Sequence, residues 1–190
     1  MIQKHLYFLF ITSLAFFACT TQVLAQDNLD YQTLDWNDLI PAADREALLN
    51  PPSYLDQIDD SVFDIEYGDE FSAALPADDP YQQALVSQNV IPEMDGQAVR
   101  VPGFIVPLEF DDTLNVTEFF LVPYFGACIH LPPPPPNQMI YVTSTEGIQL
   151  DVLYDPFWIS GVLGTDVTIN TLGTSVYTMQ LDEFEEYVIQ

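Results

Sequence analysis

Basic residues are scarce in this chain of 190 residues, which has only 3 lysines and arginines against 29 acidic residues and a formal net charge of −26. Proteins that bind nucleic acids need a basic surface to neutralise phosphate groups, and anionic lipid surfaces attract basic segments. The composition therefore excludes nucleic acid as a partner and direct binding to anionic membranes. It is compatible with a folded core, because 48% of the residues are hydrophobic and 13% are aromatic. The length predicts one domain, with room for an appendage.

The first 25 residues have the layout of a secretory signal peptide. A weakly basic start precedes an apolar run over residues 6–18, and residues 23–25 form a small-residue cleavage pattern. The apolar run is too short for a comfortable membrane span. We therefore predict that residues 1–25 are removed and that the mature protein is periplasmic or secreted in a bacterium. Cys19 leaves one alternative open, a lipoprotein anchored at that cysteine, although the residues before it match such a site poorly.

Cysteine and histidine are also scarce, with two of each in the whole chain. Removal of residues 1–25 leaves only Cys128 and His130. A single cysteine cannot form an intramolecular disulfide. In an oxidising compartment, a lone thiol binds metal, pairs with another chain, or is buried and inert. These two residues are therefore the first candidates for metal binding or catalysis.

Residues 26–95 differ from the rest of the chain, and we predict that they form an acidic arm of short helices and irregular structure. Residues 42–49 have the pattern of a short helix that ends before Pro51, and a second short helix is expected over residues 81–86. We expect the arm to pack against a larger body through four apolar side chains, Trp36, Leu39, Leu48 and Leu49.

Residues 96–190 are rich in strand patterns. Apolar or alternating runs between turn residues predict five or six short strands, over residues 99–106, 116–122, 139–143, 148–153, 157–163 and 175–179. Gly103 interrupts the first run, and a strand glycine permits the sharp bend that a small barrel needs. The expected fold is mainly β, a small OB-like barrel of five or six strands with an N-terminal arm of short helices. An open sandwich is the alternative, and residues 182–187 are expected to form a short amphipathic helix.

The stretch around Cys128 carries the most specific chemistry. In an extended chain, side chains two positions apart point the same way, so Cys128 and His130 share one face. A thiolate and an imidazole are good ligands for zinc or copper(I), and the same groups form the nucleophile and base of thiol enzymes. The plain alternative is a cysteine buried as a small hydrophobe and a histidine with an ordinary polar partner. Two ligands do not complete a tetrahedral zinc site, and Glu109, Glu118 and Asp155 are candidates for the rest by chemistry alone.

A run of prolines directly follows this pair. Five consecutive prolines lock the chain into a stiff polyproline II segment without backbone donors. Such a segment either gives the Cys-x-His stretch a rigid neighbour or presents a docking ledge to another protein. The candidate partner-binding residues are Pro132, Pro133, Pro134, Pro135, Pro136, Asn137 and Gln138.

Residues 126–138, which run Gly-Ala-Cys-Ile-His-Leu, five prolines, Asn-Gln, closely resemble the exported bacterial proteins of domain of unknown function family 3299. The similarity includes residues 100–109, 119–124 and 157–163, and it extends over residues 95–180. The resemblance implies a periplasmic accessory protein, because relatives look like accessories of transport systems and in some cases are linked to zinc response. It implies no catalytic residue.

Three functions remain open from the sequence. The first is a periplasmic accessory or binding protein that handles zinc through Cys128 and His130 for a transport system. The second is a protein-interaction module that docks on a membrane transporter through the proline run, without metal. The third is a thiol enzyme with Cys128 as nucleophile and His130 as base, although a base on the same face is poorly placed to reach a leaving group. The chain has no serine-hydrolase elbow, phosphate loop or zinc-protease motif, so we expect a binding protein rather than an enzyme.

Overall fold

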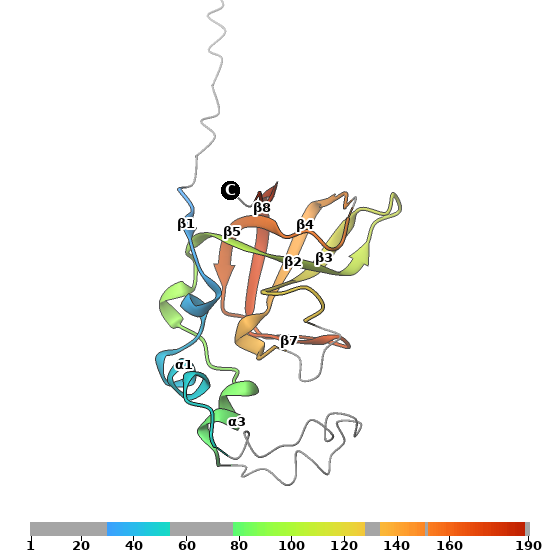
Figure 1. Ribbon diagram of the computed structural model, residues 1–190. Helices are drawn as coiled ribbons and strands as arrows, with labels where there is room; N and C mark the ends of the chain where they lie inside the picture. The colour runs from blue at the N-terminus through green and yellow to red at the C-terminus, as the bar shows by residue number, and fades with distance from the viewer. Residues whose placement is uncertain (1–29, 54–77, 128–133, 151, 189–190) are drawn as a thin grey trace, which may run out of the picture.

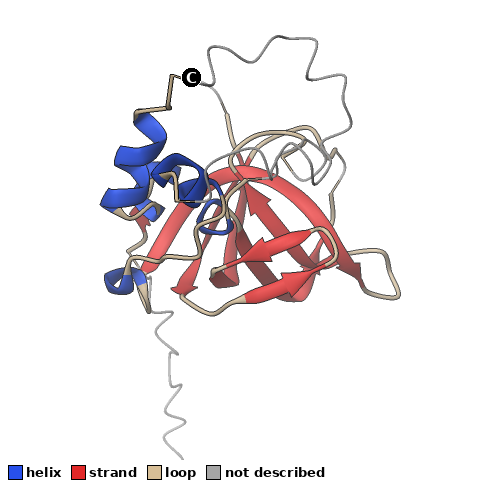
Figure 2. Ribbon diagram, turned by 90° about the horizontal axis from the view of Figure 1, so that it is seen from below, coloured by secondary structure: helices blue, strands red, loops and turns tan. Residues whose placement is uncertain are grey.

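The computed structural model describes residues 30–53, 78–127, 134–150 and 152–188. Its strands form a barrel, and the helices α1 and α3 lie together to one side of it (Figures 1 and 2). The helical elements are η1 (Trp36–Leu39), α1 (Ala42–Leu49), α3 (Pro80–Leu85), η4 (Pro92–Met94) and η5 (Pro136–Gln138). The strands are β1 (Gln32–Thr33), β2 (Ala98–Phe110), β3 (Val116–Val122), β4 (Ile140–Ile148), β5 (Phe157–Gly164), β6 (Thr168–Asn170), β7 (Gly173–Ser175) and β8 (Tyr177–Glu186).

Five strands close into a barrel in the order β2–β3–β4–β8–β5, and β5 pairs with β2 again. β4 and β8 run parallel, whereas the other neighbours in the barrel are antiparallel. Fully buried side chains from these strands, such as Val99, Phe119, Ile140 and Ile159, fill the interior. A closed five-stranded barrel in which the last strand lies between two earlier ones is OB-like. The predicted mainly β fold with a small barrel is therefore confirmed, and the alternative of an open sandwich is wrong.

β2 takes part in two sides of the barrel, and it changes its main partner at Gly103. The residues from Ala98 to Gly103 pair with β5, whereas pairing with β3 begins at Phe104. A Cβ atom at residue 103 would lie 2.8 Å from the carbonyl oxygen of Val122. Only glycine permits the two backbones to approach this closely. The glycine expected to have a special role in the first strand therefore lies where β2 changes partner and approaches β3 closely.

The N-terminal arm is joined to the barrel by strand pairing and by burial. Gln32 and Thr33 of β1 pair in parallel with β2. Leu34, Trp36 and Leu39 belong to the same buried cluster as the side chains inside the barrel. The arm therefore shares the core of the barrel.

Both predicted helices of the arm are confirmed to within one residue, as α1 (Ala42–Leu49) and α3 (Pro80–Leu85). The expected packing face is only partly right. Trp36 and Leu39 are buried, but Leu48 is half-buried and Leu49 is 74% exposed. The reason is that α1 makes its main contacts with α3.

The C-terminal part differs from the prediction in two places. The helix expected over residues 182–187 is wrong, because β8 continues to Glu186 and pairs with β5. The ring of Phe184 stacks on that of Phe157 at a centroid distance of 4.7 Å, and this burial outweighs a weak helical pattern. The strand expected over residues 148–153 is also wrong, because β4 ends at the first of these residues and the described residues from there to β5 form no strand.

Candidate functional site

The structure describes the residues on both sides of the predicted metal ligands. Four of the predicted site residues lie outside the described residues: Cys128, His130, Pro132 and Pro133. Immediately before them, Ala127 is fully buried. Immediately after them, Pro134 is buried, whereas Pro135 and Pro136 are half-buried. Both flanks of the Cys-x-His stretch are therefore anchored on the rest of the molecule.

A second apolar cluster on the outer face of the barrel provides one of these anchors. Because side chains alternate along a strand, Phe120 and Val122 of β3 point away from the interior that Phe119 helps to fill. They are nevertheless fully buried, since Ala127 and Met139 belong to the same cluster. The connection between β3 and β4 thus begins and ends against the outer face of the barrel. Four partly buried side chains complete this outer cluster: Phe104, Val106, Leu108 and Tyr141.

Asn137 and Gln138, which the sequence analysis assigns to partner binding, are buried against the N-terminal arm. The Nε2 atom of Gln138 donates a hydrogen bond of 2.8 Å to the carbonyl oxygen of Trp36. The Nδ2 atom of Asn137 donates to the carbonyl oxygen of Asn89 at 3.3 Å and to Oδ2 of Asp44 at 3.4 Å. The Oδ1 atom of Asn137 is buried, and no group of the described residues donates to it. These bonds join the end of the proline run to the arm, and a role in binding another protein stays a prediction.

A row of aromatic rings leads from Phe104, a partly buried member of the outer cluster, to two exposed residues. We call Phe104, Phe125 and Tyr154 the aromatic cluster. The ring of Phe125 meets the ring of Phe104 edge-on at a centroid distance of 6.1 Å and that of Tyr154 at 5.5 Å. Phe125 is 51% exposed and Tyr154 is 68% exposed, and contiguous apolar surface of this kind marks interaction sites. In the sequence, Phe125 precedes Cys128 by three positions.

The three carboxylates proposed as further metal ligands lie in two different places. Glu109 and Glu118 face each other across β2 and β3. Asp155 is exposed in the connection between β4 and β5. In the described part of the chain, no three carboxylate, cysteine or histidine side chains gather closely enough to hold a metal ion.

Glu118 is oriented by a tyrosine. The hydroxyl of Tyr141 donates a hydrogen bond of 2.5 Å to Oε2 of Glu118. Burial raises the pKa of Tyr141 to about 12, and the hydrogen bond to Glu118 and the negative charges of Glu118 and Glu109 raise it in the same direction. Glu118 and Phe120 lie two positions apart on β3, so Glu118 shares the face that carries the outer cluster.

No sequence pattern singled out Tyr141, Phe104 or Tyr154 as site residues. The alternation along β2 and β4 places the first two on the outer face. The alternation does not reveal that the connection between β3 and β4 returns to that face. Phe104 and Tyr141 become part of a candidate site only because of this return.

A family model described as protein of unknown function (DUF3299) matches residues 36–186. This chain belongs to that family. A crystal structure of a DUF3299 family protein from Pseudomonas aeruginosa PAO1 is 37% identical in sequence to this chain, with a TM-score of 0.61. The match covers 84% of this chain and 98% of the Pseudomonas chain. No curated protein matches.

The resemblance expected for this DUF3299 protein is therefore confirmed, including its extension beyond the motif into the barrel strands. Among the described residues, no helix is both long enough and apolar enough to cross a membrane. The described residues of the outer face combine the buried Ala127 that precedes the Cys-x-His stretch, an oriented carboxylate and exposed aromatic rings. Groups of this kind bind metals and proteins.

Proposed function

We propose that this DUF3299 protein is an exported accessory protein that binds zinc through Cys128 and His130 on behalf of a transport system. The observation that carries the proposal is the anchoring of both flanks of this stretch, by fully buried Ala127 on one side and buried Pro134 on the other. Anchored flanks reduce the conformational entropy that a metal site loses when its ligands are ordered.

Glu118 is the best of the three carboxylate candidates for a third ligand. It lies on the face that carries Ala127 and the outer cluster, and the Tyr141 hydroxyl fixes its carboxylate. Metal-binding carboxylates are commonly held by such a neighbouring hydrogen bond. Asp155, by contrast, is exposed in the connection between β4 and β5.

Isothermal titration calorimetry with zinc, supported by native mass spectrometry with and without a chelator, tests the proposal. We expect stoichiometric binding by the protein, loss of binding in Cys128→Ala, and weaker binding in Glu118→Gln. Glu46→Gln, which changes an exposed carboxylate on α1, is the matched control and should bind as the unmodified protein does. Affinity should also fall as the pH is lowered, because thiolate and imidazole must lose protons to bind. Equal zinc affinity in the protein and in Cys128→Ala would reject the proposal.

A second candidate, docking on a membrane transporter, is favoured by the exposure of the aromatic cluster. Phe125 and Tyr154 offer large rigid rings to a partner, and aromatic anchors dominate protein interfaces. The double variant Phe125→Ser with Tyr154→Ser separates the two candidates. If docking is the function, the variant loses a transporter that co-purifies with the unmodified protein from solubilised membranes, while zinc binding is unchanged. If zinc binding falls and co-purification persists, docking through this cluster is excluded.

A further inference from the structure

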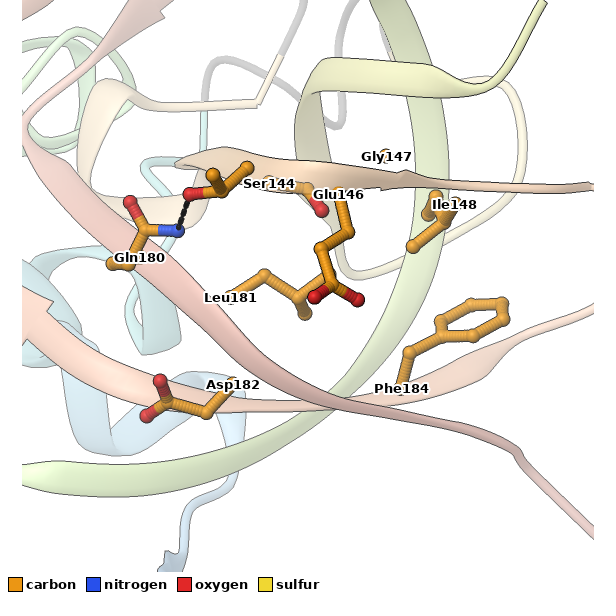
Figure 3. Close-up of a pocket in the computed structure, with 9 residues that line it drawn as sticks. Ser144, Glu146, Gly147, Ile148, Gln180, Leu181, Asp182 and Phe184 are labelled. Atoms are coloured by element: carbon orange, nitrogen blue, oxygen red, sulfur yellow. Dashed lines mark hydrogen bonds between the residues drawn. The ribbon is translucent and has the colours of Figure 1, made fainter. Parts of the chain in front are cut away.

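A groove opens where β4 and β8 separate. The two strands pair in parallel only from Ile140 to Thr143 and from Tyr177 to Gln180. β4 then continues to Ile148 and β8 to Glu186, and over these described residues neither strand has a ladder partner on the other. A cavity of about 570 Å³ lies between the diverging strands (Figure 3).

Irregular pairing on β4 shapes one wall of the groove. Thr143 pairs with Glu118 of β3, but the next paired residue of β4 is Ile148, which faces Val116. The residues between them bulge out of the ladder, and Gly147 has a φ of +70° there. Strand bulges of this kind change the direction of side chains and end pairing.

A bulge on β8 shapes the other wall. Ser160 of β5 faces Glu183, whereas its neighbour Gly161 faces Leu181, so one residue of β8 is left over. As a result Leu181 and Phe184, which lie three positions apart, both pack against the barrel core. The groove is therefore bounded by the irregular parts of two strands, β4 and β8, whose side chains share the barrel core.

Within the described ranges, no strand pairs with the edge of β8 that faces the groove. From Leu181 to Glu186, β8 pairs with β5 only, so its other edge has no strand partner among the described residues. Such an edge presents a row of backbone N–H and C=O groups. An extended peptide that adds to a free strand edge satisfies these groups, and side-chain pockets beside the edge then select its sequence.

The side chains of the groove indicate the chemistry of that peptide. Ile148, Leu181 and Phe184 provide an apolar floor. Glu146 extends from β4 toward β8, and it lines the groove together with Leu181 and Phe184 (Figure 3). No hydrogen bond or ion pair joins this carboxylate to another side chain in the described part of the chain. A chain with a net charge of −26 also attracts cationic partners at long range.

We propose that the groove between β4 and β8 is the docking site for an extended segment of a partner protein. The segment pairs with the free edge of β8, places apolar side chains on Leu181 and Phe184, and sets a lysine or arginine against Glu146. The groove is separate from the proposed zinc site, because it includes neither Cys128 nor His130.

The test uses the full chain and a fluorescent peptide in which valine and lysine alternate. A second peptide of the same length and charge, in which proline replaces valine, has the same electrostatic attraction but cannot form a strand. Fluorescence anisotropy should show binding of the first peptide and at least tenfold weaker binding of the second. Hydrogen exchange should show new protection in residues 181–186 when the first peptide is bound.

Glu146→Gln should raise the dissociation constant of the valine-lysine peptide by about fivefold, as expected for one partly exposed ion pair. Glu46→Gln removes the same charge from α1 and should leave the dissociation constant unchanged. Equal binding of the two peptides would overturn the proposal, because attraction by net charge alone predicts that result. Equal effects of the two substitutions, or protection that appears away from residues 181–186, would overturn it as well.

Discussion

The hydroxyl of Tyr177 donates a hydrogen bond of 3.0 Å to the main-chain carbonyl oxygen of Leu39, which lies 138 positions earlier in the chain. The same hydroxyl oxygen accepts a hydrogen bond of 2.9 Å from the N–H of Ile91. Tyr177 is fully buried at the start of β8. One phenol group therefore joins the barrel to two separate parts of the N-terminal arm.

Tyr177→Phe should destabilise the protein by about 1–3 kcal/mol, because the carbonyl of Leu39 and the N–H of Ile91 would lose their shared partner inside the molecule. The free energy of unfolding in urea measures this loss. Tyr187→Phe is the matched control, since that ring is 36% exposed, and it should change stability by less than about 0.5 kcal/mol. Similar losses in both variants would contradict a joining role for the Tyr177 hydroxyl.

Gln138→Leu should cost more stability than Asn137→Leu, although both positions are buried and adjacent. The first substitution leaves the carbonyl of Trp36 without its 2.8 Å donor, at a cost of about 1–2 kcal/mol. The second removes hydrogen bonds of only 3.3 and 3.4 Å together with a buried oxygen that has no donor among the described residues. Urea unfolding followed by tryptophan fluorescence compares the two variants. The reverse order would show that these hydrogen bonds do not govern the docking of the arm.

Gly103→Ala should destabilise the barrel by about 1–3 kcal/mol, as overpacking in a core does. The added carbon would lie 2.8 Å from the carbonyl oxygen of Val122 and 2.9 Å from the side chain of Leu121. Gly96→Asn is a useful comparison, because residue 96 has a φ of +74° and no atom within 4 Å of an added Cβ. Asparagine tolerates that backbone conformation, so its cost should be clearly smaller in thermal unfolding. Equal losses of stability in the two variants would mean that the backbone freedom of glycine, rather than the close approach of Val122 and Leu121, explains why residue 103 is a glycine.

The stability of the protein should fall as the pH rises from about 10 to about 12. Tyr141 keeps its proton in the folded state up to a pKa of about 12, whereas a tyrosine in an unfolded chain loses it at about 10. The unfolded chain binds fewer protons in this interval, so the free energy of unfolding decreases with pH. Tyr141→Phe should make the decrease shallower. Glu118→Gln should lower the pKa of Tyr141, because the variant removes one of the negative charges that raise it.

Urea unfolding at a series of alkaline pH values measures the slope, and ultraviolet absorbance of tyrosinate follows the titration itself. An unchanged slope in Tyr141→Phe would assign the alkaline loss to other groups. Tyr31 and Tyr177, whose pKa values are also raised by burial, would then be the next variants to test.

Local sequence patterns were sufficient for much of the fold. The helix at Ala42–Leu49 has a stop signal in the prolines that follow, and most barrel strands alternate between turn residues. A special role for Gly103 was also predictable, because a glycine within an apolar strand often marks a bend or a close backbone approach. The family resemblance rested on the residues around the proline run, and it holds over residues 36–186.

Structural features that depend on contacts between distant parts of the sequence were not predictable. The acidic end of the chain suggests a helix, but β5 offers it a strand edge and Phe157 offers Phe184 a stacking partner. Asn137 and Gln138 follow a proline run that suggests an exposed ledge, yet the arm supplies acceptors that bury both side chains.

The sequence by itself determined the acidity of this protein, the isolation of Cys128 and His130 as the chemical residues of the predicted mature chain, and the strand content of the barrel. These properties follow from residue type and from the two-residue period of strands, which do not depend on distant neighbours. Only the tertiary structure decided that the arm shares the core, that the connection from β3 to β4 returns to the outer face, and that β4 and β8 part to form a groove. Each of these results depends on which segments meet, and that choice is made by the total area buried rather than by any local pattern.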